Sequence, residues 1–201
     1  TNTKSALIAS GFLDSNITVQ IDTSPPPVAD IIVICRAVET VADWNLIKPA
    51  FEAGTPIVFG SANNLTQGIG RSMASTYANL TGTYSVVSND AGIYSQEITD
   101  NSNYITSPFQ IGQLTIYTAP NYGYALDSGA AFVGTALADS DPNQSLAGLI
   151  TLIDIPAGTL DLTGTPTPAN AVVWSDLYGA QSLYTSDGAE LLARCIDKCL
   201  M

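Results

Sequence analysis

The 201-residue sequence contains no histidine and few basic residues. Histidine is the side chain best suited to proton transfer near neutral pH, so its absence excludes the common Ser-His and Cys-His mechanisms. Only 6 Lys and Arg residues oppose 18 Asp and Glu residues, which gives a net charge of −12. A negative surface field repels phosphate backbones and anionic lipid headgroups. We therefore expect no nucleic-acid partner and no binding to anionic membrane surfaces.

Long apolar runs and a paired set of cysteines are also missing. No apolar run approaches the roughly 20 residues that span a bilayer, so we expect no membrane insertion. The three cysteines are an odd number, which argues against a disulfide framework. Cys35 closes an apolar run, and Cys195 and Cys199 lie four residues apart in a helical pattern. We expect all three to be small core residues.

What is present is the composition of a folded globule. Hydrophobic residues make up 46% of the chain and charged residues only 12%, so Ser, Thr, Asn, Gln and Gly supply most of the polar surface. The length fits one hydrophobic core. We expect residues 1–201 to form a single domain, either alone or as part of a larger chain or assembly.

Two apolar runs flank a helical pattern near the start of the chain. The runs are Ala29–Cys35 and Thr55–Gly60, and both are typical of strands buried on two faces. Between them, Trp44–Ala53 has apolar residues three and four apart and ends before Gly54. These segments predict one β-α-β unit with parallel strands.

Further elements follow from the same patterns. Strands are expected at Ile17–Asp22, Tyr84–Val87, Gln113–Tyr117, Ala131–Leu137, Leu149–Ile155 and Asn170–Ser175. Helices are expected at Thr3–Phe12, where a strand at Ser5–Ala9 is the alternative, and at Leu65–Leu80 and Ser186–Leu200. The polar stretch Asn89–Ser107 indicates an exposed excursion, and Pro156–Pro168 a long turn or small hairpin.

This order of elements resembles the flavodoxin-like domain of the class I glutamine amidotransferase-like superfamily, including its trehalose-utilisation (ThuA-like) branch. The resemblance rests on Ala29–Cys35, Trp44–Gly54, Thr55–Ser61 and the strand Asn170–Ser175. It also rests on Leu183–Leu192, which is similar to the family's L-T-x-D-G-x-x-L-L helix entry. The resemblance implies an α/β fold, specifically a three-layer flavodoxin-like domain with a mainly parallel sheet.

The family's catalytic residues are not found in this chain. In catalytic members a Cys nucleophile follows the strand that resembles Thr55–Gly60, and a His activates it. Here Ser61 stands after that strand, and the sequence offers neither a His nor a Ser-x-x-Lys pattern. We expect Ser61 to be a strand-end residue or a helix cap. If Thr3–Phe12 is a helix, the family's first strand is also missing, which leaves a sheet edge that a partner chain could cover.

Two groups of residues are candidate binding sites. Asp139, Asp141 and Asn143 begin like a calcium loop, although Gln144 stands where the loop needs Gly and Ile150 where it needs Glu. A polar turn is the alternative interpretation.

The second group lies on a loop that contains Gly and Pro, and its members are Tyr117, Asn121, Tyr122 and Tyr124. Tyrosines on such a loop suit sugar stacking or a protein interface. Packing over the end of the sheet is the alternative.

The sequence therefore favours a non-catalytic structural or binding domain of a secreted, cell-surface or virion assembly. A protein partner or a homo-oligomer is expected, carbohydrate is the other candidate ligand, and no cofactor is expected. One alternative is a ThuA-like hydrolase or sugar-processing enzyme that works through carboxylates. Another is a calcium-dependent carbohydrate-binding module.

Overall fold

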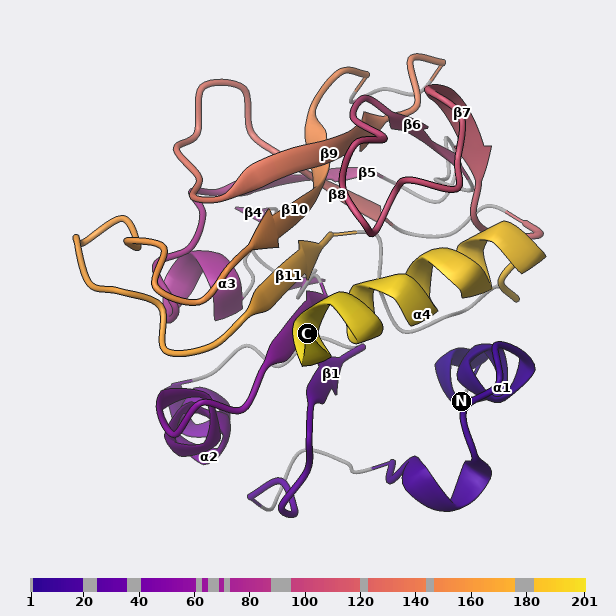
Figure 1. The fold of residues 1–201 in the computed structure, drawn as a ribbon. Coiled ribbons are helices and arrows are strands. Elements are labelled where there is room, and N and C mark those ends of the chain that lie inside the picture. Colours follow the sequence, from indigo (N-terminus) through magenta and orange to yellow (C-terminus); the bar gives the residue numbers. More distant parts are fainter. Residues whose placement is uncertain are drawn as a thin grey trace.

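The computed structural model of this chain contains two β-sheets flanked by helices (Figure 1). It describes residues 2–19, 25–35, 41–60, 63–64, 69–70, 73–87, 95–119, 123–143, 147–175 and 183–201. The α-helices in these ranges are α1 (Asn2–Ala9), α2 (Val41–Glu52), α3 (Met73–Thr76) and α4 (Ser186–Leu200), and a 3₁₀ turn, η1, covers Asp14–Asn16.

Seven strands form the larger sheet. Their spatial order is β1 (Ile32–Ile34), β2 (Ile57–Gly60), β11 (Ala171–Trp174), β10 (Ile150–Ile155), β9 (Thr135–Ser140), β6 (Ser95–Ile98) and β7 (Gly112–Thr115). The smaller sheet has the order β3 (Asn63–Asn64), β4 (Ile69–Gly70), β5 (Tyr84–Val87) and β8 (Gly123–Leu126).

The prediction of an α/β fold is confirmed, but the larger sheet is mixed rather than mainly parallel. Only β1, β2 and β11 run parallel, with β2 in the middle. From β11 onward every neighbouring pair is antiparallel. One reason is the connection from β9 to β10, which is shorter than the crossover of about a dozen residues that a parallel pair needs. The smaller sheet is a second departure from the expected flavodoxin-like arrangement.

Both strands of the predicted β-α-β unit, the strand at Asn170–Ser175 and the helices at Trp44–Ala53 and Ser186–Leu200 are confirmed. Helix α1 confirms the helix expected near the N-terminus, and an isolated bridge between Leu160 and Pro166 confirms the small hairpin.

Three other predictions from the sequence are wrong in the described residues. Residues 17–19 form no strand, because this segment follows η1 and its first carbonyl accepts a hydrogen bond from Lys4. The helix expected at Leu65–Leu80 is limited to α3 and gives way to strand β4. The stretch Asn89–Ser107 contains β6, which lies inside the sheet between β9 and β7.

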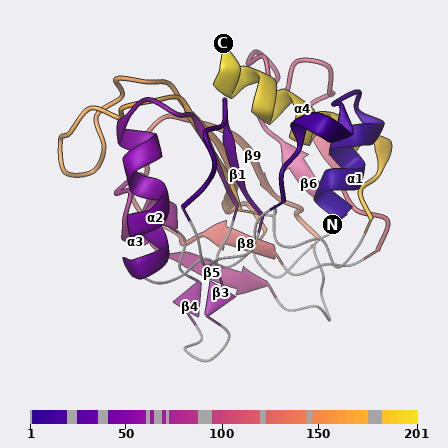
Figure 2. The ribbon, with the colours of Figure 1, turned by 90° about the horizontal axis from the view of Figure 1, so that it is seen from below.

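Hydrophobic clusters cover the two faces of the larger sheet. Val172 and Trp174 of β11 pack with α1 and α4, whereas Ala171 and Val173 pack with α2, α3 and the smaller sheet. Figure 2 shows α1 and α4 on one side of the larger sheet, with α2 and the smaller sheet on the other. All four residues of β11 are buried, as are all four of β2. The continuous apolar runs in the sequence are explained by this double coverage.

Helix α4 begins at a side-chain cap and lays one apolar stripe on the sheet. The hydroxyl oxygen of Thr185 accepts a hydrogen bond from the Gly188 amide at 3.0 Å, which satisfies a free donor of the first turn. The buried stripe includes Leu191, Leu192, Cys195, Ile196 and Cys199. The prediction that Cys195 and Cys199 are buried is therefore confirmed.

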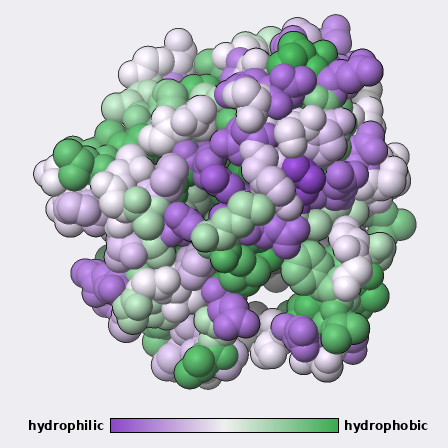
Figure 3. Space-filling view, viewed as in Figure 1, coloured by the Kyte–Doolittle hydropathy of each residue, from purple (hydrophilic) through white to green (hydrophobic). Residues whose placement is uncertain are grey.

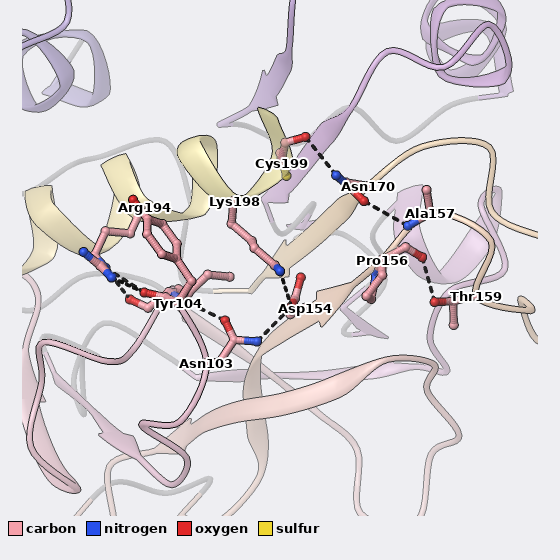
Figure 4. A network of polar contacts seen from close by, with 11 residues as sticks. Asn103, Tyr104, Asp154, Pro156, Ala157, Thr159, Asn170, Arg194, Lys198 and Cys199 are labelled. Atoms are coloured by element: carbon pink, nitrogen blue, oxygen red, sulfur yellow. Dashed lines mark hydrogen bonds and ion pairs between the residues drawn. The ribbon is translucent and has the colours of Figure 1, made fainter. Parts of the chain in front are cut away.

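Polar contacts also hold α4 against the sheet (Figure 4). Asp154 of β10 is 5% exposed, and its carboxylate lies 3.7 Å from the Lys198 ammonium. The same carboxylate accepts a hydrogen bond of 2.8 Å from the Asn103 side chain. One turn earlier, Arg194 donates to the carbonyl of Tyr104 at 2.8 Å, and its guanidinium lies 4.2 Å from the centre of that tyrosine ring. These contacts fix α4 to β10 and to the segment before β7.

The surface mixes polar and apolar side chains (Figure 3). Hydrophobic residues gather where Figure 1 places α1 and at the bottom, where the chain enters β1. Val28, in the segment before β1, is fully exposed. Among the described helices, none is long and apolar enough to cross a membrane.

Substitution of Gly188 by Ala tests how closely α4 approaches the chain after β7. A Cβ at this position would lie 2.1 Å from the carbonyl oxygen of Ile116, a backbone atom. Although Ala favours a helix by about 1 kcal/mol over Gly, we expect Gly188→Ala to lower the free energy of unfolding by about 1–3 kcal/mol through overpacking. Urea denaturation measures the change. The exposed Glu190→Ala control should stay within about 0.5 kcal/mol of the wild type, and an equally stable Gly188→Ala variant would contradict the packing.

Candidate functional site

The candidate site lies at one end of the larger sheet. The carboxyl ends of β1, β2 and β11 meet there, and we call this end the carboxyl edge. Because the later neighbours are antiparallel, the first residues of β10 and β6 and the last residues of β9 and β7 lie at the same edge. In open α/β sheets, ligands bind outside the carboxyl ends of the strands. The carboxyl edge is therefore the candidate functional site.

Buried polar side chains gather at this edge. They are Ser95, Gln96, Ser140, Asp141, Thr151 and Ser175. Gln96 lies directly opposite both Leu114 and Ser140 in the sheet, and Leu114 belongs to the cluster under α1 and α4. Since successive side chains alternate between faces, Gln96 and Ser140 face α1 and α4, whereas Ser95 and Asp141 face the opposite side.

Asp141 is the best-satisfied acid of the site. Its carboxylate accepts hydrogen bonds from the hydroxyl of Ser95, the amide of Gln113, and both the backbone and the side chain of Asn143. Burial of Asp141 raises its pKa, but these four donors together outweigh burial and hold the pKa below the ordinary value. Asp141 is therefore a charged hydrogen-bond acceptor at neutral pH and not a proton donor.

Two acids face each other beside Asp141. Glu97 and Asp139 are direct cross-strand partners on β6 and β9. Partial burial, together with the nearby charge of Glu97, raises the pKa of Asp139. Like charges in directly opposite positions destabilise a sheet, so this pair is a strained feature.

The geometry gives the predicted calcium site at Asp139, Asp141 and Asn143 no support. The Asn143 amide donates to Asp141 at 2.9 Å instead of presenting an oxygen with it. Within the described ranges, no three His, Cys, Asp or Glu residues are arranged to hold a metal ion. These contacts match the polar-turn interpretation of the segment.

The predicted tyrosine group is not brought together either. Tyr117 is 1% exposed and packs on Tyr184, with ring centres 5.0 Å apart, in the cluster under α1 and α4. Tyr124 is 0% exposed and lies in the cluster on the other face of the larger sheet. Asn121 and Tyr122 lie outside the described residues. Tyr117 and Tyr124 are therefore core residues on opposite faces, which matches the packing alternative.

Aromatic rings occupy the α1 and α4 side of the carboxyl edge. Trp174, the last residue of β11, is 0% exposed, and its ring centre lies 6.4 Å from that of Tyr184. Burial, as the largest effect, raises the pKa of Tyr184 well above its ordinary value. Tyr184 is therefore a neutral phenol at physiological pH.

Cys35 follows β1 at the carboxyl edge, and its thiol is a candidate nucleophile. Its thiol donates to the carbonyl of Val33 at 3.6 Å. Burial raises the pKa of this thiol to about 11, so the thiolate needed for attack is scarce near neutral pH. Ser61, the residue that matches the family's nucleophile position, lies outside the described residues.

On the strands of the larger sheet, three buried polar atoms at the carboxyl edge have no hydrogen-bond partner among the described residues. They are Nε1 of Trp174, Nε2 of Gln96 and Oγ of Ser140. The other end of the Gln96 amide is satisfied, because its oxygen accepts from the Thr151 hydroxyl at 3.2 Å. Buried polar groups in native proteins are nearly always paired with protein, water or ligand.

Several residues of this site were not singled out from the sequence. Ser95 and Gln96 were missed because β6 lies within a polar stretch that favours a loop. Gln113 lies in a predicted strand, but its contact with Asp141 depends on long-range pairing that the sequence does not show. The alternation Ser95-Gln96-Glu97-Ile98 is too short and too polar to stand out as a strand. The only usable signal was that a 19-residue structureless excursion, Asn89–Ser107, is unusual in a compact domain.

Comparison with known proteins places no family name on this geometry. No protein-family model matches the sequence, and neither a curated protein nor a solved structure matches it.

Asp141→Asn tests the role of the buried carboxylate. We expect it to lower the free energy of unfolding by about 2 kcal/mol near pH 7, because charged hydrogen bonds at a buried site are lost. Since the folded pKa is depressed, the wild-type advantage is fully present above the unfolded value of 3.8 and disappears as the pH falls through the folded value. Urea denaturation at about pH 7 and at about pH 3 measures the effect. The exposed Asp30→Asn serves as the control, and an equal loss for Asp141→Asn at both pH values would refute this assignment.

Proposed function

We propose that this chain is a non-catalytic structural or binding domain of a secreted, cell-surface or virion assembly. The observation that carries the proposal is the unpaired outer side of β1, because an open strand edge is a ready site for adding another chain. Among the described residues, β1 pairs with β2 alone.

The hydrogen-bonding groups of this edge follow from the pairing. The Ile32 amide donates to Pro56 beside β2 at 3.0 Å, so it faces inward. Because backbone groups alternate along a strand, the amide and carbonyl of Val33 face away from β2. Ile32, Val33 and Ile34 are all apolar, and no charge or proline of the kind that blocks edges interrupts them.

At the opposite end of the same sheet, the residues that follow β7 pair with the segment before α4. Beyond β7, Tyr117 forms an antiparallel bridge with Tyr184. The amide of Thr118 donates to the carbonyl of Leu183 at 2.8 Å, and the amide of Thr185 donates to that of Ile116 at 3.0 Å. Assembly through β1 is therefore favoured by the short, uninterrupted apolar sequence of β1, since among the described residues β7 also has one strand partner, β6.

The chemistry of the carboxyl edge also favours a non-catalytic role. Its thiol and phenol are neutral at physiological pH, its best-buried acid is held in hydrogen bonds, and the sequence supplies no histidine. A carboxylate enzyme would need two acids placed around a substrate, whereas Glu97 and Asp139 oppose each other within the sheet. The calcium-dependent carbohydrate-binding module is disfavoured by the contacts of Asp141 and Asn143.

The proposed location, in a secreted, cell-surface or virion assembly, rests on the sequence. The low content of Lys and Arg and the net charge of −12 suit a solvated exterior surface, not nucleic acid. We also propose amidotransferase-like ancestry, supported by the confirmed β-α-β unit from β1 to β2 and by the parallel placement of β11.

A second copy of the chain is the simplest partner to test. Two β1 strands related by a two-fold axis would pair antiparallel, and such an interface is self-complementary. We expect sedimentation velocity at about 0.15 M salt, where charge repulsion is screened beyond about 8 Å, to show a concentration-dependent dimer. Val33→Pro should abolish it, because proline removes the outward amide while leaving the bonds to β2 intact.

Further variants distinguish pairing through the β1 edge from an effect on folding and from catalysis. Val33→Thr keeps the outward amide and a β-branched side chain, so it should still dimerise. Hydrolysis of glutamine and of a simple ester should be no faster for the wild type than for Cys35→Ala or Ser61→Ala. Turnover that either substitution abolishes, together with association that Val33→Pro leaves unchanged, would overturn the proposal in favour of an enzyme.

A further inference from the structure

The floor of the carboxyl edge under α1 and α4 contains hydrogen-bond donors that the described chain does not use. Trp174, Gln96 and Ser140 are each 0% exposed, and their Nε1, Nε2 and Oγ atoms lack a partner among the described residues. Burying a donor without an acceptor costs free energy comparable to a lost hydrogen bond. Three such atoms at one end of one sheet point to an acceptor outside the described residues.

The three side chains share one face of the sheet. Gln96 and Ser140 are direct cross-strand partners, and both face α1 and α4. Trp174 packs in the cluster under these helices and lies directly opposite Leu152, which is in turn paired with Ala138 of β9. Thr151, beside Leu152, is hydrogen-bonded to Gln96. The floor therefore extends from β6 through β9 and β10 to β11, with register shifts on both sides of Leu152 where β9 pairs with β10.

The side chains of the floor favour an uncharged oxygen atom as the missing hydrogen-bond acceptor. The indole N–H of Trp174 and the Nε2 group of Gln96 can only donate, so the missing group must accept. In the part of the chain that the structure describes, no positive side chain belongs to the floor, and the net charge of −12 disfavours an anion. A hydroxyl oxygen fits, because it can accept from the indole or amide and also exchange a hydrogen bond with the Ser140 hydroxyl.

We propose that the floor formed by Gln96, Ser140 and Trp174 binds hydroxyl oxygens, supplied either by internal water or by a small uncharged polyol. The position agrees with the general preference of α/β folds for ligands at the carboxyl ends of their strands. Internal waters typically make about 3 hydrogen bonds to buried polar groups that would otherwise be unpaired. This site is separate from the β1 edge and does not depend on the proposed assembly.

The two tryptophans of the chain allow a direct test by NMR. The indole N–H of Trp174 reports on the floor, and that of Trp44, which lies in the cluster on the other face, is an internal control. Trp174→Phe assigns the two resonances. In the isotope-labelled full chain, we expect an Overhauser cross-peak from the Trp174 indole proton to a long-lived water, or a saturable shift of that resonance on titration with glycerol, with Trp44 unchanged.

The two sources are distinguished by these two readouts. A water cross-peak without a glycerol response assigns internal water, and a saturable glycerol shift assigns a polyol site. Ser140→Ala should reduce the cross-peak or weaken glycerol binding at least tenfold, whereas the exposed Ser128→Ala should do neither. Absence of both a water cross-peak and a glycerol response at Trp174, or an unchanged response in a folded Ser140→Ala variant, would overturn the proposal.

Discussion

The burial of β2 and β11 on both faces is the constraint on which the rest of the structure depends. Successive side chains of β11 enter opposite hydrophobic clusters, one under α1 and α4 and one against α2, α3 and the smaller sheet. Burying a large apolar side chain contributes about 1.5–3 kcal/mol, so these two strands join both cores into one cooperative unit. Helices α2 and α4 are held where they cover this pair.

This constraint also shapes the carboxyl edge. Because β2 and β11 are central and parallel, their carboxyl ends lie beside strand ends delivered by the antiparallel half of the sheet. Polar side chains at those ends cannot reach solvent, so they must bond to one another, as around Asp141, or to something outside the described chain, as proposed for Trp174. The same geometry keeps Cys35 and Tyr184 neutral. The thiol and the phenol of this edge are therefore poorly suited to proton transfer near neutral pH, whereas Asp139 is the carboxyl group whose pKa is raised.

The sequence predicts most strands of the larger sheet, including β7 and β10, but it predicts neither β6 nor the antiparallel direction of the later strands. A continuous apolar run such as Thr55–Gly60 indicates a strand that is buried on both faces. The apolar stripe of α4 indicates a helix with one face packed on the sheet. Strand β6 is different, because its Ser, Gln and Glu side chains are polar and are recognisable only through their partners on β7 and β9.

Local patterns also miss which site candidates lie together in space. Tyr117 and Tyr124 are close in the sequence but are separated by the sheet, which a local pattern cannot reveal.

Amide hydrogen exchange along β1 tests the account most directly. In the dilute, monomeric chain we predict slow exchange for Ile32, whose amide bonds toward β2, and fast exchange for Val33, whose amide faces outward. On association the Val33 amide should become protected, while Ile32 changes little. A Val33 amide that is already protected in the monomer, or that stays unprotected when the chain associates, would contradict the claim that β1 is an open edge used for assembly.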